Sequence, residues 1–163
     1  MKLERIIRID LDRQQLSLYQ GHELLSSYPV STSKDGPGEE MGSGRTPRGL
    51  HRIRIKIGAG LPENSVFVGR RPTGEIYTPE LGENNPERDW ILTRILWLTG
   101  LEPDRNRGSN VDTLRRLIYI HGCPDSEPMG IPASHGCIRM RNCDLLDLFE
   151  LVDTDTAGHN FSF

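Results

Sequence analysis

Two short triplets hold the residues of this 163-residue chain that are best suited to chemistry: His121-Gly122-Cys123 and His135-Gly136-Cys137. A cysteine attacks an acyl carbon as its thiolate, and a histidine within hydrogen-bond distance can remove the thiol proton. We expect Cys137 to be the nucleophile and His121 to be its base. Backbone N–H groups of Gly136 and Cys137 are expected to face the oxyanion that develops during attack, a large contribution to acyl transfer.

The same residues also admit readings without catalysis. Free cysteine packs as a small hydrophobe, and a buried histidine can simply bond to a carbonyl. Residues two apart on a strand share a face, so the two triplets could also supply four zinc ligands, namely His121, Cys123, His135 and Cys137. Structural zinc sites prefer a two-residue gap between ligands, which disfavours this alternative. A non-enzymatic binding module is a third reading, and it leaves the Cys–His pair without a purpose.

Hydrophobic alternation predicts the strands that must position these triplets. Ile7, Ile9 and Leu11 alternate with polar residues, the pattern continues to Leu18, and a turn at 20–22 leads to a return strand, which predicts one hairpin. Further strands are expected at 53–57, 66–68, 90–98 and 117–120.

The remaining segments are expected to be loops and helices. Residues 32–49 and 124–133 are rich in turn formers, 70–89 predicts a polar loop, and Asn110 is expected to cap a helical piece over 111–116. Asn142 resembles a helix N-cap, and the residues after it have one apolar face: Leu145, Leu148, Phe149 and Val152. The sum is a mainly β single domain with one clear helix near the C-terminus.

Charge, hydropathy and cysteine content indicate the cellular location and the partners to expect. The net charge is −3 and the pI is about 6.0, which indicates neither a nucleic-acid partner nor a polybasic membrane patch. The longest apolar run, 117–120, is too short for a membrane span. Three cysteines cannot all pair, and residues 1–5 have no apolar signal region. These features predict a cytoplasmic protein, with a periplasmic location as the alternative if an export signal was removed.

The block Ser134-His135-Gly136-Cys137-Ile138-Arg139, with His121 sixteen positions before Cys137, resembles the signature of the L,D-transpeptidase catalytic domain, also called the YkuD domain. Two weaker matches extend the resemblance over residues 5–152: the Leu16-Ser17-Leu18-Tyr19 strand end and the Thr46-Pro47-Arg48-Gly49 turn.

The resemblance implies a single catalytic domain over 1–163, a β-sandwich or open barrel with one helix after the catalytic cysteine. Residues 61–110 match nothing specific and are expected to form or cap the substrate groove. The family's usual last strand is expected to be altered or absent here, because the chain reads Asp153-Thr154-Asp155-Thr156-Ala157-Gly158.

The resemblance also implies roles for the site residues. Cys137 would attack the L,D bond between a diamino acid, such as meso-diaminopimelate, and terminal D-Ala. His121 would be oriented by the Gly122 carbonyl, and His135 would support the thiolate. Arg139 would hold a substrate carboxylate; the alternative is an ion pair with another side chain of the protein, behind the site or at the surface. Ser134 and Gly122 complete the expected substrate-binding set, and no cofactor is implied.

The acyl-enzyme has two expected fates. Hydrolysis would make the protein an L,D-carboxypeptidase that acts on soluble muropeptides in recycling. Attack by an amine would make an exported enzyme that forms 3-3 crosslinks or attaches a lipoprotein. We expect hydrolysis, a monomer, and acylation by carbapenems. Other residues are expected to be structural or surface residues: Cys143, His22, His51 and His159; Cys123 either lines the site or merely packs.

Overall fold

The computed structural model describes residues 3–162, and confirms a mainly β single-domain fold. Met1 and Lys2 belong to the segment 1–5 in which no apolar signal region was found, and they lie outside the described residues. The strands are β1 (Arg5–Asp10), β2 (Gln15–Gln20), β3 (Glu23–Ser31), β4 (Gly49–Ile57), β5 (Ser65–Val68), β6 (Arg71–Ile76), β7 (Ile91–Gly100), β8 (Tyr119–Gly122), β9 (Ile138–Met140) and β10 (Ala157–Phe161). The helices are α1 (Pro79–Asn84), α2 (Asn142–Leu151) and the 3₁₀ turn η1 (Ser109–Val111).

Strand pairing closes most of the sheet into a barrel. The order is β4-β10-β1-β2-β3-β9-β8-β7, and β7 pairs again with β4, so that eight strands form a ring. β5 and β6 continue from the outer edge of β7. Most pairs are antiparallel, but β1–β10 and β8–β9 are parallel.

Alternating side chains fill the barrel with a single apolar core. Ile7, Leu16, Ile53 and Ile120 are at most 2% exposed and belong to one cluster. The apolar face of α2 joins this cluster through Leu145, Leu148 and Phe149, as its helical spacing predicts. None of the helices between residues 3 and 162 is both long and apolar enough to cross a membrane.

Several predicted boundaries are wrong. A turn over 11–14 separates β1 from β2, so the opening region has three strands and two hairpins. The last strand is present as β10, which lies between β1 and β4. The piece expected to be helical over 111–116 is a series of turns after η1, and β8 starts two residues later than predicted. Leu117 itself is exposed, with a φ of 60°.

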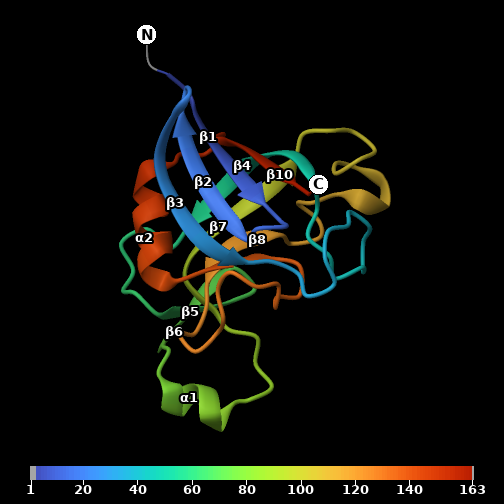
Figure 1. Cartoon of the computed structure of the whole chain (residues 1–163). Coiled ribbons are helices and arrows are strands. Elements are labelled where there is room, and N and C mark those ends of the chain that lie inside the picture. The colour runs from blue at the N-terminus through green and yellow to red at the C-terminus, as the bar shows by residue number, and fades with distance from the viewer. Residues whose placement is uncertain (1–2, 163) are drawn as a thin grey trace.

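Residues 70–89 are not a simple loop, because they contain β6 and α1 (Figure 1). This extension projects from the end of the barrel and has no buried residue in α1. Arg88 pairs with Glu75 through contacts of 2.8 and 3.1 Å, and its guanidinium lies 4.2 Å from the centre of the Trp90 ring. Residues 61–110 therefore comprise β5, this extension, the barrel strand β7 and the segment from 101 into η1.

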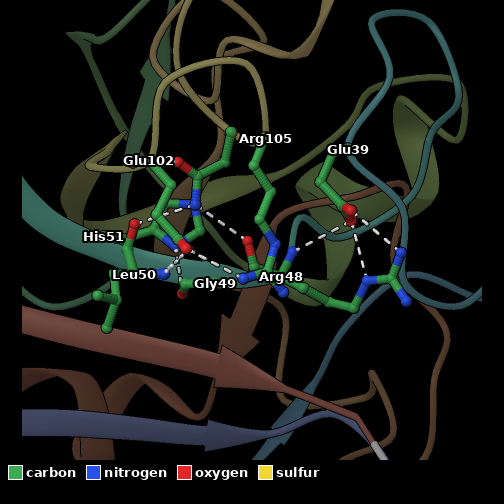
Figure 2. Close-up of polar contacts among 8 residues, drawn as sticks. Glu39, Arg48, Gly49, Leu50, His51, Glu102 and Arg105 are labelled. Atoms are coloured by element: carbon green, nitrogen blue, oxygen red, sulfur yellow. Dashed lines mark hydrogen bonds and ion pairs between the residues drawn. The ribbon is translucent and has the colours of Figure 1, made fainter.

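His51 is buried, which corrects its expected position at the surface. Its Nδ1 donates to the Gly49 carbonyl at 3.0 Å and its Nε2 accepts from the Thr113 hydroxyl at 2.9 Å. Glu102, which accepts from the Leu50 N–H, lies nearby in the same polar cluster (Figure 2). Burial lowers the pKa of His51 to about 4.

Acid should therefore weaken the fold through His51. The unfolded chain binds a proton near pH 6.5, whereas the folded chain resists it until about pH 4. Stability should be intact above pH 6.5 and fall by about 3 kcal/mol as the pH drops to 4. Urea denaturation at both pH values tests this. His51→Gln should flatten the dependence, whereas His22→Gln, at an exposed position, should not; equal slopes in all three proteins would contradict the assignment.

Candidate active site

The two triplets lie close together in the sheet, because β8 holds His121 and Gly122 and Cys137 directly precedes its neighbour β9. β8 and β9 pair in parallel with Ile120 opposite Ile138, and both side chains point into the core. Because side chains alternate, His121 projects to the other face of β8. Cys137 directly precedes β9 and packs against Ile95 and Tyr119, and Ile95 pairs with His121, so the two side chains share this face.

His121 is held rigidly and in one tautomer. The ring is 2% exposed, and its Nδ1 lies 2.7 Å from the Gly122 carbonyl oxygen. A carbonyl can only accept, so Nδ1 carries the proton and Nε2 has the lone pair. Nε2 has no hydrogen-bond partner among the residues described. Burial lowers the pKa of His121, with the Gly122 bond opposing it, so that the ring is neutral at pH 7. The predicted orientation by Gly122 is thus present in the geometry.

Cys137 is half-buried at the start of β9. Its sulfur accepts the Tyr119 N–H at 3.3 Å, and its S–H donates to the Leu117 carbonyl at 3.3 Å. Burial raises the pKa of the thiol to about 11, while the Tyr119 N–H lowers it. Spontaneous thiolate is therefore rare at neutral pH, and attack requires a base that removes the proton.

Charged side chains near Cys137 shift the pKa of its thiol in opposite directions. Asp89 raises the pKa of the thiol, whereas Arg139 and Arg116 lower it. Arg116 hydrogen-bonds to neutral groups, namely the Gly38 and Arg45 carbonyls and the Ser43 hydroxyl. Since none of these bonds goes to a carboxylate, the positive charge of Arg116 is available to stabilise a thiolate. Sequence reasoning missed this residue, which no motif marks.

The loop before Cys137 is fixed by internal bonds. The buried Ser134 hydroxyl donates to the Cys137 carbonyl at 2.6 Å and accepts the Gly136 N–H at 3.2 Å. The Gly136 N–H, which is expected to face the oxyanion, thus donates to Ser134 in this structure. Ser134, which is expected to bind substrate, holds the loop in shape. The Cys137 N–H has no partner among residues 3–162. Gly136 has a φ of 131°, a conformation that favours glycine.

Thr46 holds this loop from a segment that is distant in the sequence. Its hydroxyl donates to the Gly136 carbonyl at 2.9 Å and accepts the Ser33 N–H at 3.0 Å. The side chain is fully buried. The Thr-Pro-x-Gly resemblance marked this turn, but its spacing in the sequence gave no indication of a contact with Gly136.

Replacing Thr46 by valine should loosen the loop at nearly constant volume. Two buried polar groups lose their partner, so the free energy of unfolding should fall by about 2 kcal/mol. The displaced Cys137 backbone should lower kcat about 10- to 100-fold. Chemical denaturation and single-turnover rates measure both effects. Thr154→Val, at an exposed position, is the matched control, and a fully active Thr46→Val protein would argue against loop anchoring.

Asn142 supports the segment after His121, which corrects its predicted role as an N-cap. The cap residue of α2 is Arg141. The buried Asn142 amide donates to the Cys123 carbonyl at 2.9 Å and accepts from the Thr93 hydroxyl at 2.6 Å. A Cβ on Gly122 would lie 2.2 Å from Asn142 Oδ1, so glycine is required there. Gly122 acts through this close packing and through its bond to His121.

A pocket of about 220 Å³ opens beside the site. His135 is exposed and lines it together with Arg139 and Cys123. Arg139 is 9% exposed, and its guanidinium faces the carboxylates of Glu127 and Asp89 at 3.4 and 3.9 Å. The ion-pair alternative for Arg139 is therefore present in the structure, next to a space that a ligand can enter.

The zinc alternative is not supported. Between residues 3 and 162, no group of three or more His, Cys, Asp or Glu side chains is arranged to hold a metal ion. The Cys123 sulfur donates to the Met140 carbonyl at 3.6 Å, and the Cys137 sulfur is directed to Leu117. Cys123, Cys137 and Cys143 are all free thiols.

Comparison with known proteins identifies the family. Residues 4–158 match the family described as the L,D-transpeptidase catalytic domain, YkuD. The chain belongs to this family. A curated relative, the probable L,D-transpeptidase YbiS of Escherichia coli, is 28% identical over 117 residues. The match covers 68% of this chain but only 38% of YbiS, so the chain spans well under half of that relative.

Solved L,D-transpeptidase structures share the fold. The enzyme from Xylanimonas cellulosilytica matches with a TM-score of 0.62 at 18% identity, over 99% of this chain and 62% of that chain. The L,D-transpeptidase LdtMt1 in complex with imipenem matches with a TM-score of 0.58 at 18% identity, over 98% of this chain and 59% of that chain.

Proposed function

We propose that this L,D-transpeptidase-family protein is a cysteine enzyme that cleaves peptidoglycan stem peptides at the L,D bond before terminal D-Ala. One observation carries the proposal. The neutral His121 ring has its free Nε2 on the same face as Cys137, which directly precedes the neighbouring strand β9. A base in this state can activate a thiol whose pKa is about 11.

The reaction proceeds in two balanced steps. His121 Nε2 takes the thiol proton as the Cys137 sulfur attacks the carbonyl carbon, and the oxyanion faces the Cys137 N–H. The C–N bond breaks, His121 returns the proton to the amine of D-Ala, and a thioester remains. Water then attacks the thioester, His121 takes its proton and returns it to the sulfur, and the tripeptide leaves.

Hydrolysis is the outcome we favour over crosslinking. Three free thiols suit a reducing compartment, and soluble muropeptides are the substrates available there. We therefore propose a cytoplasmic, monomeric L,D-carboxypeptidase that acts in peptidoglycan recycling. An amine acceptor would instead give a 3-3 crosslink or lipoprotein attachment through the same thioester.

Incubation with a free tetrapeptide stem separates these outcomes. Mass spectrometry should detect tripeptide and D-Ala in equal amounts. Crosslinked dimer without tripeptide would refute hydrolysis while supporting the thioester, and an unchanged tetrapeptide would refute the proposed activity.

Acylation by carbapenems is proposed by analogy with the imipenem complex of LdtMt1. A strained lactam offers Cys137 an activated carbonyl in place of the L,D bond. The intact protein should gain the mass of one carbapenem.

A further inference from the structure

A second pocket, of about 390 Å³, opens between strands β4 and β7 and the segment 107–115. Trp97 Nε1 on β7 donates to the Leu114 carbonyl at 3.1 Å, which holds this segment against the strand. We propose that the pocket binds a diphosphate group, either as the free ion or as part of a nucleotide. The proposal is independent of the proposed function, because no residue of this pocket belongs to the catalytic site.

Strand register places a cation and a hydroxyl side by side in this pocket. Arg52 lies opposite Thr99 in the pairing of β4 with β7. The next pair, Ile53 and Leu98, belongs to the barrel core. Because side chains alternate along a strand, Arg52 and Thr99 project away from the core. Both line the pocket, so a ligand that enters it meets the two side chains together.

The pocket concentrates positive charge that the protein leaves largely unpaired. Its lining contains four arginines, namely Arg52, Arg54, Arg107 and Arg115. Within residues 3–162, only Arg52 of these four forms an ion pair, with Asp155. The carboxylate of the lining, Asp112, has both oxygens occupied, because they accept the Gly108 N–H at 2.7 Å and the Arg115 N–H at 2.9 Å. Three guanidinium groups therefore remain available to an anion.

Thr99 contributes a buried hydroxyl to the same pocket. The residue is 9% exposed, and its hydroxyl has no hydrogen-bond partner among residues 3–162. Leaving a buried polar group without a partner costs free energy, so such groups are normally paired. An anionic oxygen that accepts from this hydroxyl removes that cost. The hydroxyl therefore indicates a built site, where exposed arginines alone would indicate only a charged surface.

Charge and size favour a diphosphate over a single carboxylate. Once Asp112 and Asp155 are counted against the four arginines, the pocket keeps two positive charges, although the whole chain has a net charge of −3. Guanidinium groups match phosphate oxygens in a bidentate geometry. The volume lies within the range of small-molecule sites, about 300–1,000 Å³. A diphosphate has enough oxygens to reach arginines on the strand and on the covering segment at once, whereas a carboxylate does not.

Calorimetry of the full chain with inorganic diphosphate, adenosine diphosphate and sulfate tests the proposal. At equal ionic strength, diphosphate should bind at least about 10-fold more tightly than sulfate. Tighter binding of adenosine diphosphate would identify a nucleotide as the source of the group, whereas equal or weaker binding would identify the diphosphate itself. Failure of both diphosphates to bind more tightly than sulfate would overturn the proposal.

Four variants separate a built site from general attraction of anions. Arg54→Gln and Arg115→Gln should each weaken diphosphate binding roughly 10-fold. Thr99→Val should weaken it about 5-fold without lowering the urea midpoint of the free protein, because the hydroxyl has no partner to lose. Arg13→Gln removes the same charge from a side chain that is 82% exposed and outside the pocket, so it should bind as the wild type does. Equal losses in Arg13→Gln and Arg54→Gln, or unchanged binding in Thr99→Val, would refute the site.

Discussion

Cys137→Ala is expected to abolish D-Ala release from a tetrapeptide stem, with a loss of at least about 10⁴-fold in kcat. The substitution removes the atom that forms the thioester, and no other sulfur can replace it. Cys123 is buried with its thiol directed to the Met140 carbonyl, and burial raises its pKa to about 12. Mass spectrometry of the reaction mixture measures the loss.

Cys143→Ala is the matched control for this prediction. Cys143 lies exposed on α2, and its removal should leave turnover unchanged. A carbapenem provides an independent measurement, because the wild type and Cys143→Ala should gain the adduct mass and Cys137→Ala should not. An adduct on Cys137→Ala would identify another nucleophile and end the proposed mechanism.

His121→Asn should lower kcat by about 10²- to 10⁴-fold. Asparagine keeps an amide N–H near the position of Nδ1, which can still donate to the Gly122 carbonyl, but it has no counterpart of Nε2. The thiol then has no base and must ionise on its own, with a pKa of about 11. Residual activity should therefore rise with pH well into the alkaline range.

The pH dependence of wild-type kcat/KM shows whether His121 acts as a base or only supports the fold. Burial lowers the pKa of His121, so the ring stays neutral as the pH falls below 6.5. The acid limb of kcat/KM should lie below pH 6.5 and disappear in His121→Asn. His22→Asn, at an exposed position, should retain the wild-type profile. An unchanged acid limb in His121→Asn would show that another group controls the ionisation.

Strands with one buried face could be predicted from the sequence, whereas others could not. β4 and β7 were predicted because their apolar residues alternate or cluster. β6 was missed because nearly all of its residues are exposed, so no face carries an apolar signal. β10 was missed because its short, mostly half-buried sequence is stabilised by pairing with β1 and β4, which no local pattern reveals.

Some residues of the site could likewise be predicted from the sequence, and others could not. Cys137 and His121 could be proposed from residue type and spacing, because nucleophile chemistry demands those side chains. Thr46 and Asn142 could not, since their contacts join residues 90 and 19 positions apart. The oxyanion role expected of Gly136 stays a prediction; its N–H donates to the Ser134 hydroxyl, a contact that depends on loop conformation and that no sequence pattern reveals.

The closed strand order has a consequence for behaviour at high concentration. An open sheet presents unpaired backbone groups at both margins, and these can recruit a second chain and begin aggregation. β6 is the last strand in the described strand order, so one of its margins is unpaired. That margin carries Pro72, which lacks a donor, and the charged Arg71 and Glu75, features that discourage intermolecular pairing. The unpaired margin of β6 is thereby protected against ordered self-association.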